Sequence, residues 1–209
     1  ARPFAGVSRG VVLLAGGADF PDRMLVAGGQ KVYHDEILML DPSAAPPSWR
    51  VVGRLPRPQG EGGSTTTAQG VVCVGGAVGH DGAAVVSSAF VLSWDGAAVV
   101  QKPLPDVPVP LGKMPGVAAF GDVVYVTGSN VLWRIDLASD EPRWEEAREV
   151  VGLPAVFGEQ PVLVAQKGRL FLFPGYDART GRALDARFGK TFVGTSSVAV
   201  GDQHILFFG

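Results

Sequence analysis

Short runs of apolar residues recur along the chain, and each of them ends at a glycine. The runs follow turn residues and are rich in β-branched and aromatic side chains, which is typical of buried strands. A terminal glycine gives the backbone a freedom that other residues lack. The runs occupy residues 10–17, 70–76, 121–128, 168–175 and 202–209.

Further strands are predicted on both sides of these runs. Small or hydroxylated stretches precede four of them, at residues 4–8, 63–68, 115–120 and 194–200. A third and a fourth strand follow the first and third runs. In both cases an aspartate ends the third strand and a tryptophan opens the fourth, 8 residues later, as Asp41 with Trp49 and Asp136 with Trp144. We expect both tryptophans to pack in the core between neighbouring units.

The repeating unit of four antiparallel strands resembles the kelch repeat, whose units are the blades of a β-propeller. The predicted fold is therefore all-β, a single kelch-type β-propeller domain that spans residues 1–209, with six blades in the intact protein. About four and a half blades are represented, at residues 4–56, 61–105, 113–154, 157–188 (incomplete) and 189–209 (truncated).

The spacing of the terminal glycines predicts that part of the repeat pattern is missing. Glycines 17, 76, 128, 175 and 209 are separated by 59, 52, 47 and 34 residues, so the last interval is too short for a full unit. We expect residues to be missing near Arg182–Arg187, and a further blade to follow Gly209.

Composition narrows the function classes. With 46% hydrophobic and 18% charged residues, the chain can bury a core, and intrinsic disorder is not expected. A net charge of −2 without charged runs argues against nucleic-acid and membrane partners. The single Cys73 excludes an internal disulfide framework and a thiolate zinc site. No metal site is expected at His34, because adjacent strand residues cannot converge on one ion.

Two motifs make the resemblance more specific. Residues 15–22 read Ala-Gly-Gly-Ala-Asp-Phe-Pro-Asp, and residues 28–35 read Gly-Gly-Gln-Lys-Val-Tyr-His-Asp. Together with Lys113 after Leu-Gly, and Glu159-Gln160 ahead of Tyr176-Asp177, they resemble the cyclically permuted mutarotase family, relatives of the N-acetylneuraminate epimerases.

The resemblance implies a sugar isomerase that interconverts the anomers of sialic acid (N-acetylneuraminate) by acid/base-assisted ring opening in the axial funnel. No cofactor is required, and an Arg or Lys would hold the carboxylate of this small acidic sugar. The family also implies a periplasmic or secreted monomer. Its proposed acid/base glutamate and arginine match no position in this chain. The alternative is a non-catalytic kelch propeller that binds a protein or a glycan.

Candidate binding residues lie where first strands enter the funnel, and on the long insertion at residues 19–34, which would fold over the same mouth. The strand entrances contribute Lys113, Glu159, Gln160, Glu61, Phe4 and Phe192, with Ser8 and Thr195 near them. The insertion contributes Lys31 and Tyr33, with His34 and Arg23 near them.

Overall fold

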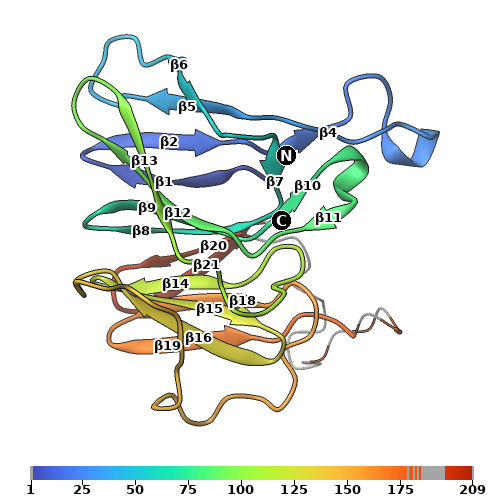
Figure 1. Ribbon diagram of the computed structural model, residues 1–209, viewed down its shortest axis with the longest axis vertical. Coiled ribbons are helices and arrows are strands. Elements are labelled where there is room, and N and C mark those ends of the chain that lie inside the picture. The colour runs from blue at the N-terminus through green and yellow to red at the C-terminus, as the bar shows by residue number, and fades with distance from the viewer. Residues whose placement is uncertain (1, 178, 181, 183, 185–195, 209) are drawn as a thin grey trace.

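The computed structural model describes residues 2–177, 179–180, 182, 184 and 196–208. Within these residues the protein is built from antiparallel strands and two short 3-10 turns, η1 (Leu25–Ala27) and η2 (His80–Gly82). Figure 1 shows the strands stacked as successive sheets, from blue at the N-terminus to red at the C-terminus. The all-β prediction is confirmed.

Three sheets contain four strands each, in the hydrogen-bonded orders β1-β2-β5-β6, β8-β9-β12-β13 and β14-β15-β16-β17. The strands of the first sheet are β1 (Phe4–Ser8), β2 (Val11–Ala15), β5 (Glu36–Leu40) and β6 (Trp49–Arg54). Those of the second are β8 (Gly63–Thr67), β9 (Gly70–Val74), β12 (Ala89–Trp94) and β13 (Val99–Leu104). Those of the third are β14 (Val117–Phe120), β15 (Val123–Gly128), β16 (Val131–Asp136) and β17 (Glu145–Glu146).

Two hairpins follow the third sheet. They consist of β18 (Val162–Gln166) with β19 (Arg169–Phe173), and of β20 (Ser196–Val200) with β21 (His204–Phe208). Tight turns close several of the hairpins, since both residues of Arg9-Gly10, Ser129-Asn130 and Lys167-Gly168 have positive φ angles. Such turns match the right-handed twist of the paired strands, so the local sequence favours the observed register.

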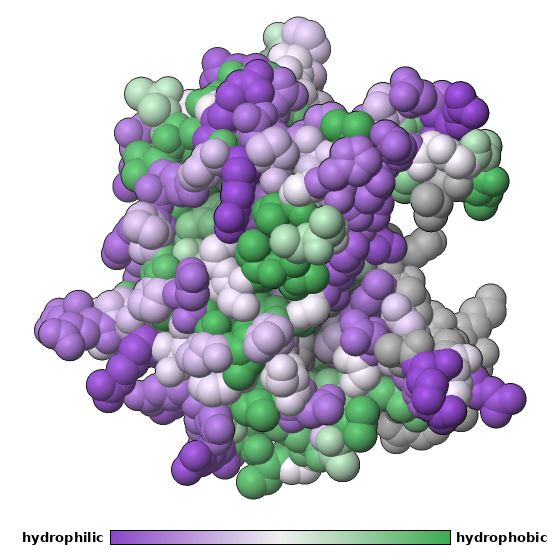
Figure 2. All heavy atoms as spheres, turned by 45° about the vertical axis from the view of Figure 1, so that its right-hand side comes forward, coloured by the Kyte–Doolittle hydropathy of each residue, from purple (hydrophilic) through white to green (hydrophobic). Residues whose placement is uncertain are grey.

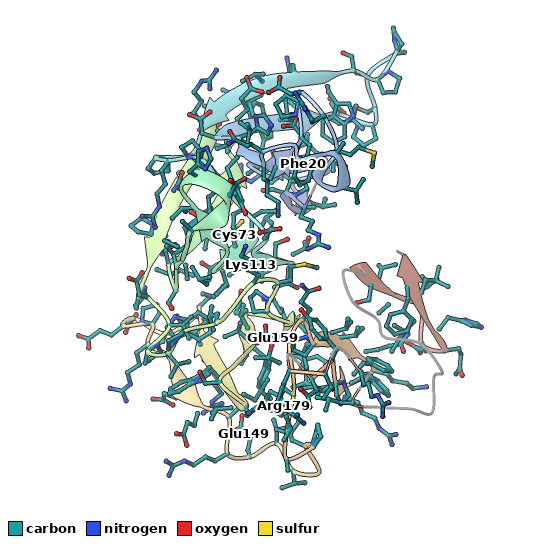
Figure 3. The ribbon with its side chains drawn as sticks, turned by 90° about the vertical axis from the view of Figure 1, so that its right-hand side faces the viewer. Phe20, Cys73, Lys113, Glu149, Glu159 and Arg179 are labelled. Atoms are coloured by element: carbon teal, nitrogen blue, oxygen red, sulfur yellow. The ribbon has the colours of Figure 1, made fainter. Side chains whose placement is uncertain are left out.

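The sheets follow one another around a common axis. The first strand of each unit contacts the first strand of the next, in the order β1, β8, β14, β18 and β20. Figure 3 looks along this axis and shows the units as an arc, with Lys113 and Glu159 on its concave side and Glu149 on its outer side. The ends of the strands therefore converge on an axial mouth.

Apolar side chains fill the space between successive sheets. In β2 the residues alternate between buried and half-buried positions, and the buried set, which includes Leu13, faces the second sheet. Phe4 and Ile37 join it against Phe90. A second cluster between the second and third sheets includes Val72 and Val124, both 0% exposed. Because each sheet has two apolar faces, stacking around an axis buries both of them.

The two predicted core tryptophans have different environments. Trp144 is buried, and its indole Nε1 donates a hydrogen bond to the carbonyl oxygen of Pro105 in the preceding unit, at 2.8 Å. Trp49 is 46% exposed, so the prediction for this residue is wrong. The described residues contain no sheet ahead of the first one, and Trp49 therefore lacks the surface that Trp144 packs against.

Two small sheets extend the mouth end of the first two units. One pairs β3 (Ala18–Asp19) with β4 (Val32–Tyr33), and the other has the order β11 (Ala84–Val85), β10 (Ala77–Val78), β7 (Gln59–Gly60). Between β3 and β4 the chain projects from the body, with both hydrophilic and hydrophobic side chains on the projecting segment (Figure 2). The helical turns of the described residues are too short to span a membrane.

Replacement of Phe4 tests the core between the first two sheets. Its side chain is 1% exposed, and its ring meets the Phe90 ring edge to face at 5.5 Å. Phe4→Ala should lower the free energy of unfolding by about 3–5 kcal/mol, measured by urea denaturation. Val51→Ala, at a position 54% exposed, is the matched control and should change it by less than about 0.5 kcal/mol. Equal effects of the two variants would contradict this core.

Candidate functional site

The first strand of each unit, which lies nearest the axis, is called its inner strand. The residues just ahead of the first four inner strands share one backbone feature. Arg2, Glu61, Met114 and Gln160 stand two or three residues ahead of β1, β8, β14 and β18, and their φ angles are 61°, 58°, 56° and 54°. Non-glycine residues rarely adopt positive φ values, and such strain is often found at functional sites. The repeat therefore places one left-handed residue per unit at the axial mouth.

Main-chain hydrogen bonds connect these entrances. The Glu61 N–H donates to the Arg2 carbonyl oxygen at 3.1 Å, and the Met114 N–H donates to the Glu61 carbonyl oxygen at 2.7 Å. Each bond joins one unit to the next. The first three entrances are thereby held in fixed order around the axis, with Glu61 in the middle.

The Glu61 side chain is the centre of a charged cluster. It is 3% exposed, and each of its carboxylate oxygens meets two partners. Oε1 accepts a hydrogen bond from Lys31 Nζ at 2.6 Å and lies 3.8 Å from a guanidinium nitrogen of Arg2. Oε2 accepts a hydrogen bond from the Tyr33 hydroxyl at 2.6 Å and lies 3.4 Å from Lys113 Nζ. Segments of three units thus meet at one carboxylate.

The insertion reaches this cluster because its base is packed and hydrogen-bonded. Tyr33 on β4 is buried with Ala18 and Ala77, which joins the two small sheets. The Lys31 backbone N–H donates to Asp81 Oδ1 at 2.7 Å. The Lys31 ammonium also lies 5.8 Å from the centre of the Phe20 ring. These contacts place Lys31 and Tyr33 beside Glu61 at the mouth.

Gly82 closes one side of the cluster. A Cβ atom at this position would lie 2.4 Å from the Tyr33 hydroxyl and 2.9 Å from Lys113 Nζ, and the backbone has a φ of +71°. The positive φ favours glycine, and a side chain here would displace the Tyr33 hydroxyl and the Lys113 ammonium. The tyrosine hydroxyl and the lysine ammonium therefore approach this backbone closely.

The electrostatics of the cluster keep the Glu61 carboxylate ionised near neutral pH. Burial opposes ionisation of Glu61, but the hydrogen bonds from Lys31 and Tyr33 and the charges of Lys31 and Lys113 outweigh it, and the pKa of Glu61 falls to about 2. Burial and the hydrogen bond to Glu61 raise the pKa of Tyr33, so this hydroxyl stays protonated. Glu61 is therefore an acceptor of hydrogen bonds and a poor base near neutral pH.

The cluster retains excess positive charge that solvent can reach. Three cations surround one carboxylate, and their side chains are 39% exposed for Arg2, 22% for Lys31 and 34% for Lys113. Glu61 itself is almost covered. An anion from solution can therefore approach the cations from the open side of the mouth.

Glu159 and Gln160 belong to a neighbouring part of the mouth. They line a cavity of about 560 Å³ that also includes Asn130, Tyr176 and Asp177. Gln160 and Arg2 line a second cavity of about 290 Å³ between the inner strands. The Gln160 side-chain oxygen is buried and has no hydrogen-bond partner within the described part of the chain. Arg2 therefore contacts both the charged cluster and this second cavity.

Several sequence-based candidates are placed differently from what was expected. Phe4 does not line the mouth, because the pleat of β1 directs its ring into the core. Ser8 is buried at the far end of β1, where its hydroxyl accepts a hydrogen bond from the backbone N–H of Trp94 at 3.0 Å. His34 contacts Asp19 at 3.1 Å, away from Glu61. Phe192 and Thr195 lie outside the described residues.

Arg2 is the site residue that the sequence reasoning missed. A signal for it exists in the repeat, because Arg2-Pro3, Met114-Pro115 and Gln160-Pro161 are equivalent residue pairs ahead of inner strands. Comparison of these pairs with Glu61-Gly62 would have identified the position. Across the described residues, no group of three or more His, Cys, Asp or Glu side chains is arranged to hold a metal ion.

No family model matches the chain. It is similar to the N-acetylneuraminate epimerases of Yersinia pestis (strain Pestoides F) and Yersinia pseudotuberculosis serotype O:1b (strain IP 31758), with 34% identity over 105 residues. This match covers 46% of the chain and 25% of each relative, so the chain spans about a quarter of the length of these curated relatives. Its backbone is similar to the solved structure of YjhT, with a TM-score of 0.60 and 11% identity, over 80% of this chain and 56% of that chain.

Antiparallel sheets arranged around an axis, with polar side chains gathered at the entrances of the inner strands, define a β-propeller protein with a charged axial mouth. The likeness to YjhT supports this fold. The partial match to the N-acetylneuraminate epimerases supports the resemblance that the sequence motifs indicate.

Acid titration tests the ionised state of Glu61. Because the folded-state pKa is lowered from 4.5 to about 2, the ionised carboxylate stabilises the fold above its unfolded pKa, and this contribution is lost as the pH falls toward 2. Urea denaturation between pH 6 and pH 2 should show the wild type losing about 3 kcal/mol of stability relative to Glu61→Gln. Parallel pH profiles of the two proteins would contradict this assignment.

Proposed function

We propose that this protein catalyses the interconversion of the anomers of N-acetylneuraminate at the axial mouth. The observation that carries the proposal is the excess positive charge of Arg2, Lys31 and Lys113 around one buried carboxylate. A sialic acid carries a carboxylate, which charge-assisted hydrogen bonds from such groups would hold. The partial match to proteins named N-acetylneuraminate epimerase supports the same substrate class.

The proposed reaction needs only proton transfers. A base takes the proton of the anomeric hydroxyl, the bond from the anomeric carbon to the ring oxygen breaks, and an acid protonates the ring oxygen. The open chain holds a ketone at the former anomeric carbon. Rotation and the reverse steps close the ring on the other face, so no atom is gained or lost.

Within this scheme the residues of the cluster bind and orient the sugar. Lys113 and Arg2, the more exposed cations, contact the substrate carboxylate, and Lys31 supports them from the insertion. Glu61 does not take the anomeric proton, because its pKa is about 2. Residues of the cavity beside Glu159 lie next to the loop that carries Lys113, and are available to the hydroxyl and acetamido groups of the sugar.

Proton NMR of freshly released α-N-acetylneuraminate tests this function. The full-length protein should bring the α and β anomers to equilibrium well above the buffer rate. Lys113→Met should raise KM about 10-fold or more and leave kcat nearly unchanged, because it removes a charge-assisted contact that substrate and transition state share.

Lys102→Met is the matched control. Lys102 is an exposed residue on β13, away from the mouth, and its loss should leave both kinetic constants unchanged. Failure of the folded wild-type protein to accelerate anomer exchange would refute the proposed function, and would favour a non-catalytic propeller that binds a protein or a glycan.

A further inference from the structure

The buried carboxylate of Glu61 has a role that the reaction itself does not require. We propose that Glu61 is a positioning residue: it docks the insertion onto the mouth and orients Lys31 and Lys113 so that they select a carboxylate-bearing sugar. The ligand part of this inference rests on the proposed function. The docking part does not, because it concerns contacts within the protein alone.

The geometry of the carboxylate supports a docking role. Lys31 and Tyr33 belong to the insertion, Arg2 precedes the first sheet, and Lys113 precedes the third, yet all four approach Glu61 within 3.8 Å. The insertion is also tied to the second unit by the small patch of Ala18, Tyr33 and Ala77, by the bond from Lys31 N–H to Asp81, and by the bond from the Gln59 N–H to the His34 carbonyl oxygen at 3.0 Å. Glu61→Gln therefore removes the negative charge that strengthens two of the hydrogen bonds that hold the insertion.

The charges around Glu61 explain why a carboxylate is needed at this position. Without it, Arg2, Lys31 and Lys113 would repel one another at close range in a partly buried site. Asp81, whose carboxylate accepts the hydrogen bond from the Lys31 N–H, is exposed and pairs with His80 at 3.0 Å. Glu61 is thus the internal counter-ion that allows three cations to face one mouth.

A positioning role and a simple effect of net charge predict opposite changes in the binding of a carboxylate ligand when Glu61 loses its charge. If the mouth attracted anions by charge alone, loss of the negative charge of Glu61 would strengthen the binding of a carboxylate ligand. If Glu61 positions the cations, the same change releases Lys31 and Lys113 from their geometry and weakens binding. Glu61→Gln, which keeps the shape and removes the charge, separates the two cases.

The first measurement needs no ligand. Hydrogen exchange of the full-length protein should show the Lys31 backbone amide exchanging about 10-fold or more faster in Glu61→Gln than in the wild type, because the insertion is no longer docked. In both proteins the Val72 amide in the core should exchange far more slowly than the Lys31 amide, which verifies that the variant is folded. Tyr33→Phe removes one hydrogen bond and keeps the ring, so it should give a smaller increase. Unchanged exchange at Lys31 in Glu61→Gln would overturn the docking role.

The second measurement uses the methyl β-glycoside of N-acetylneuraminate, whose anomeric carbon is locked and cannot react. Calorimetry should show that Glu61→Gln binds it about 10-fold or more weakly than the wild type, and that the wild type discriminates against the methyl ester of the same glycoside. Equal or tighter binding by Glu61→Gln would overturn the positioning of the lysines.

Kinetics separate positioning from proton transfer. With N-acetylneuraminate as substrate, Glu61→Gln should raise KM and leave kcat within a few fold, whereas loss of a general base lowers kcat by roughly 10²–10⁴-fold. A fall of that size would overturn the inference.

The two proposals fail in different ways. If the wild type binds the locked glycoside and Glu61→Gln does not, but neither accelerates anomer exchange, the positioning role stands and the isomerase function fails. If the wild type accelerates exchange and Glu61→Gln matches it in amide exchange, binding and kinetics, the function stands and the positioning role fails.

Discussion

The axial mouth of this protein depends on one buried carboxylate. Glu61 is 3% exposed, and four side chains from three separate parts of the chain converge on its two oxygens. A buried charge is unfavourable unless it is paired and hydrogen-bonded, so each of these partners stabilises the arrangement. The conformation of the insertion, the approach of Lys113 and the closeness of Gly82 all follow from that requirement.

The β-propeller makes this convergence possible. Each unit places the start of its inner strand at the axis, and Arg2, Glu61, Met114 and Gln160 occupy equivalent left-handed positions there. The repeat needs only the backbone geometry at these positions, which leaves the side chains free to differ. One unit therefore supplies a carboxylate, one a guanidinium and one an amide, and this variation on a fixed scaffold gives the mouth its chemistry.

Much of the fold could be predicted from the sequence because strand periodicity and glycine-rich turns are local signals. The repeat predicts the four strands of the first and third sheets and the first two strands of the second. It also places Glu61 and Lys113 ahead of first strands, whereas Lys31 and Tyr33 were expected at the mouth because they lie on the insertion. The errors concern long-range packing. Phe4 faces the core because of the pleat of β1, and the exposure of Trp49 depends on which sheet lies beside it. Arg2 was missed because its pairing with Glu61 spans two units, and its signal appears only when the residue pairs ahead of successive first strands are compared.

The central claim is that the mouth recognises the carboxylate of an acidic sugar through its cations. A crystal structure of the full-length protein with N-acetylneuraminate tests this claim most directly. We expect the sugar carboxylate to lie within hydrogen-bonding distance of Lys113 and Arg2, with Lys31 still bound to Glu61. A sugar bound with its carboxylate directed away from these residues, or bound elsewhere on the protein, would contradict it.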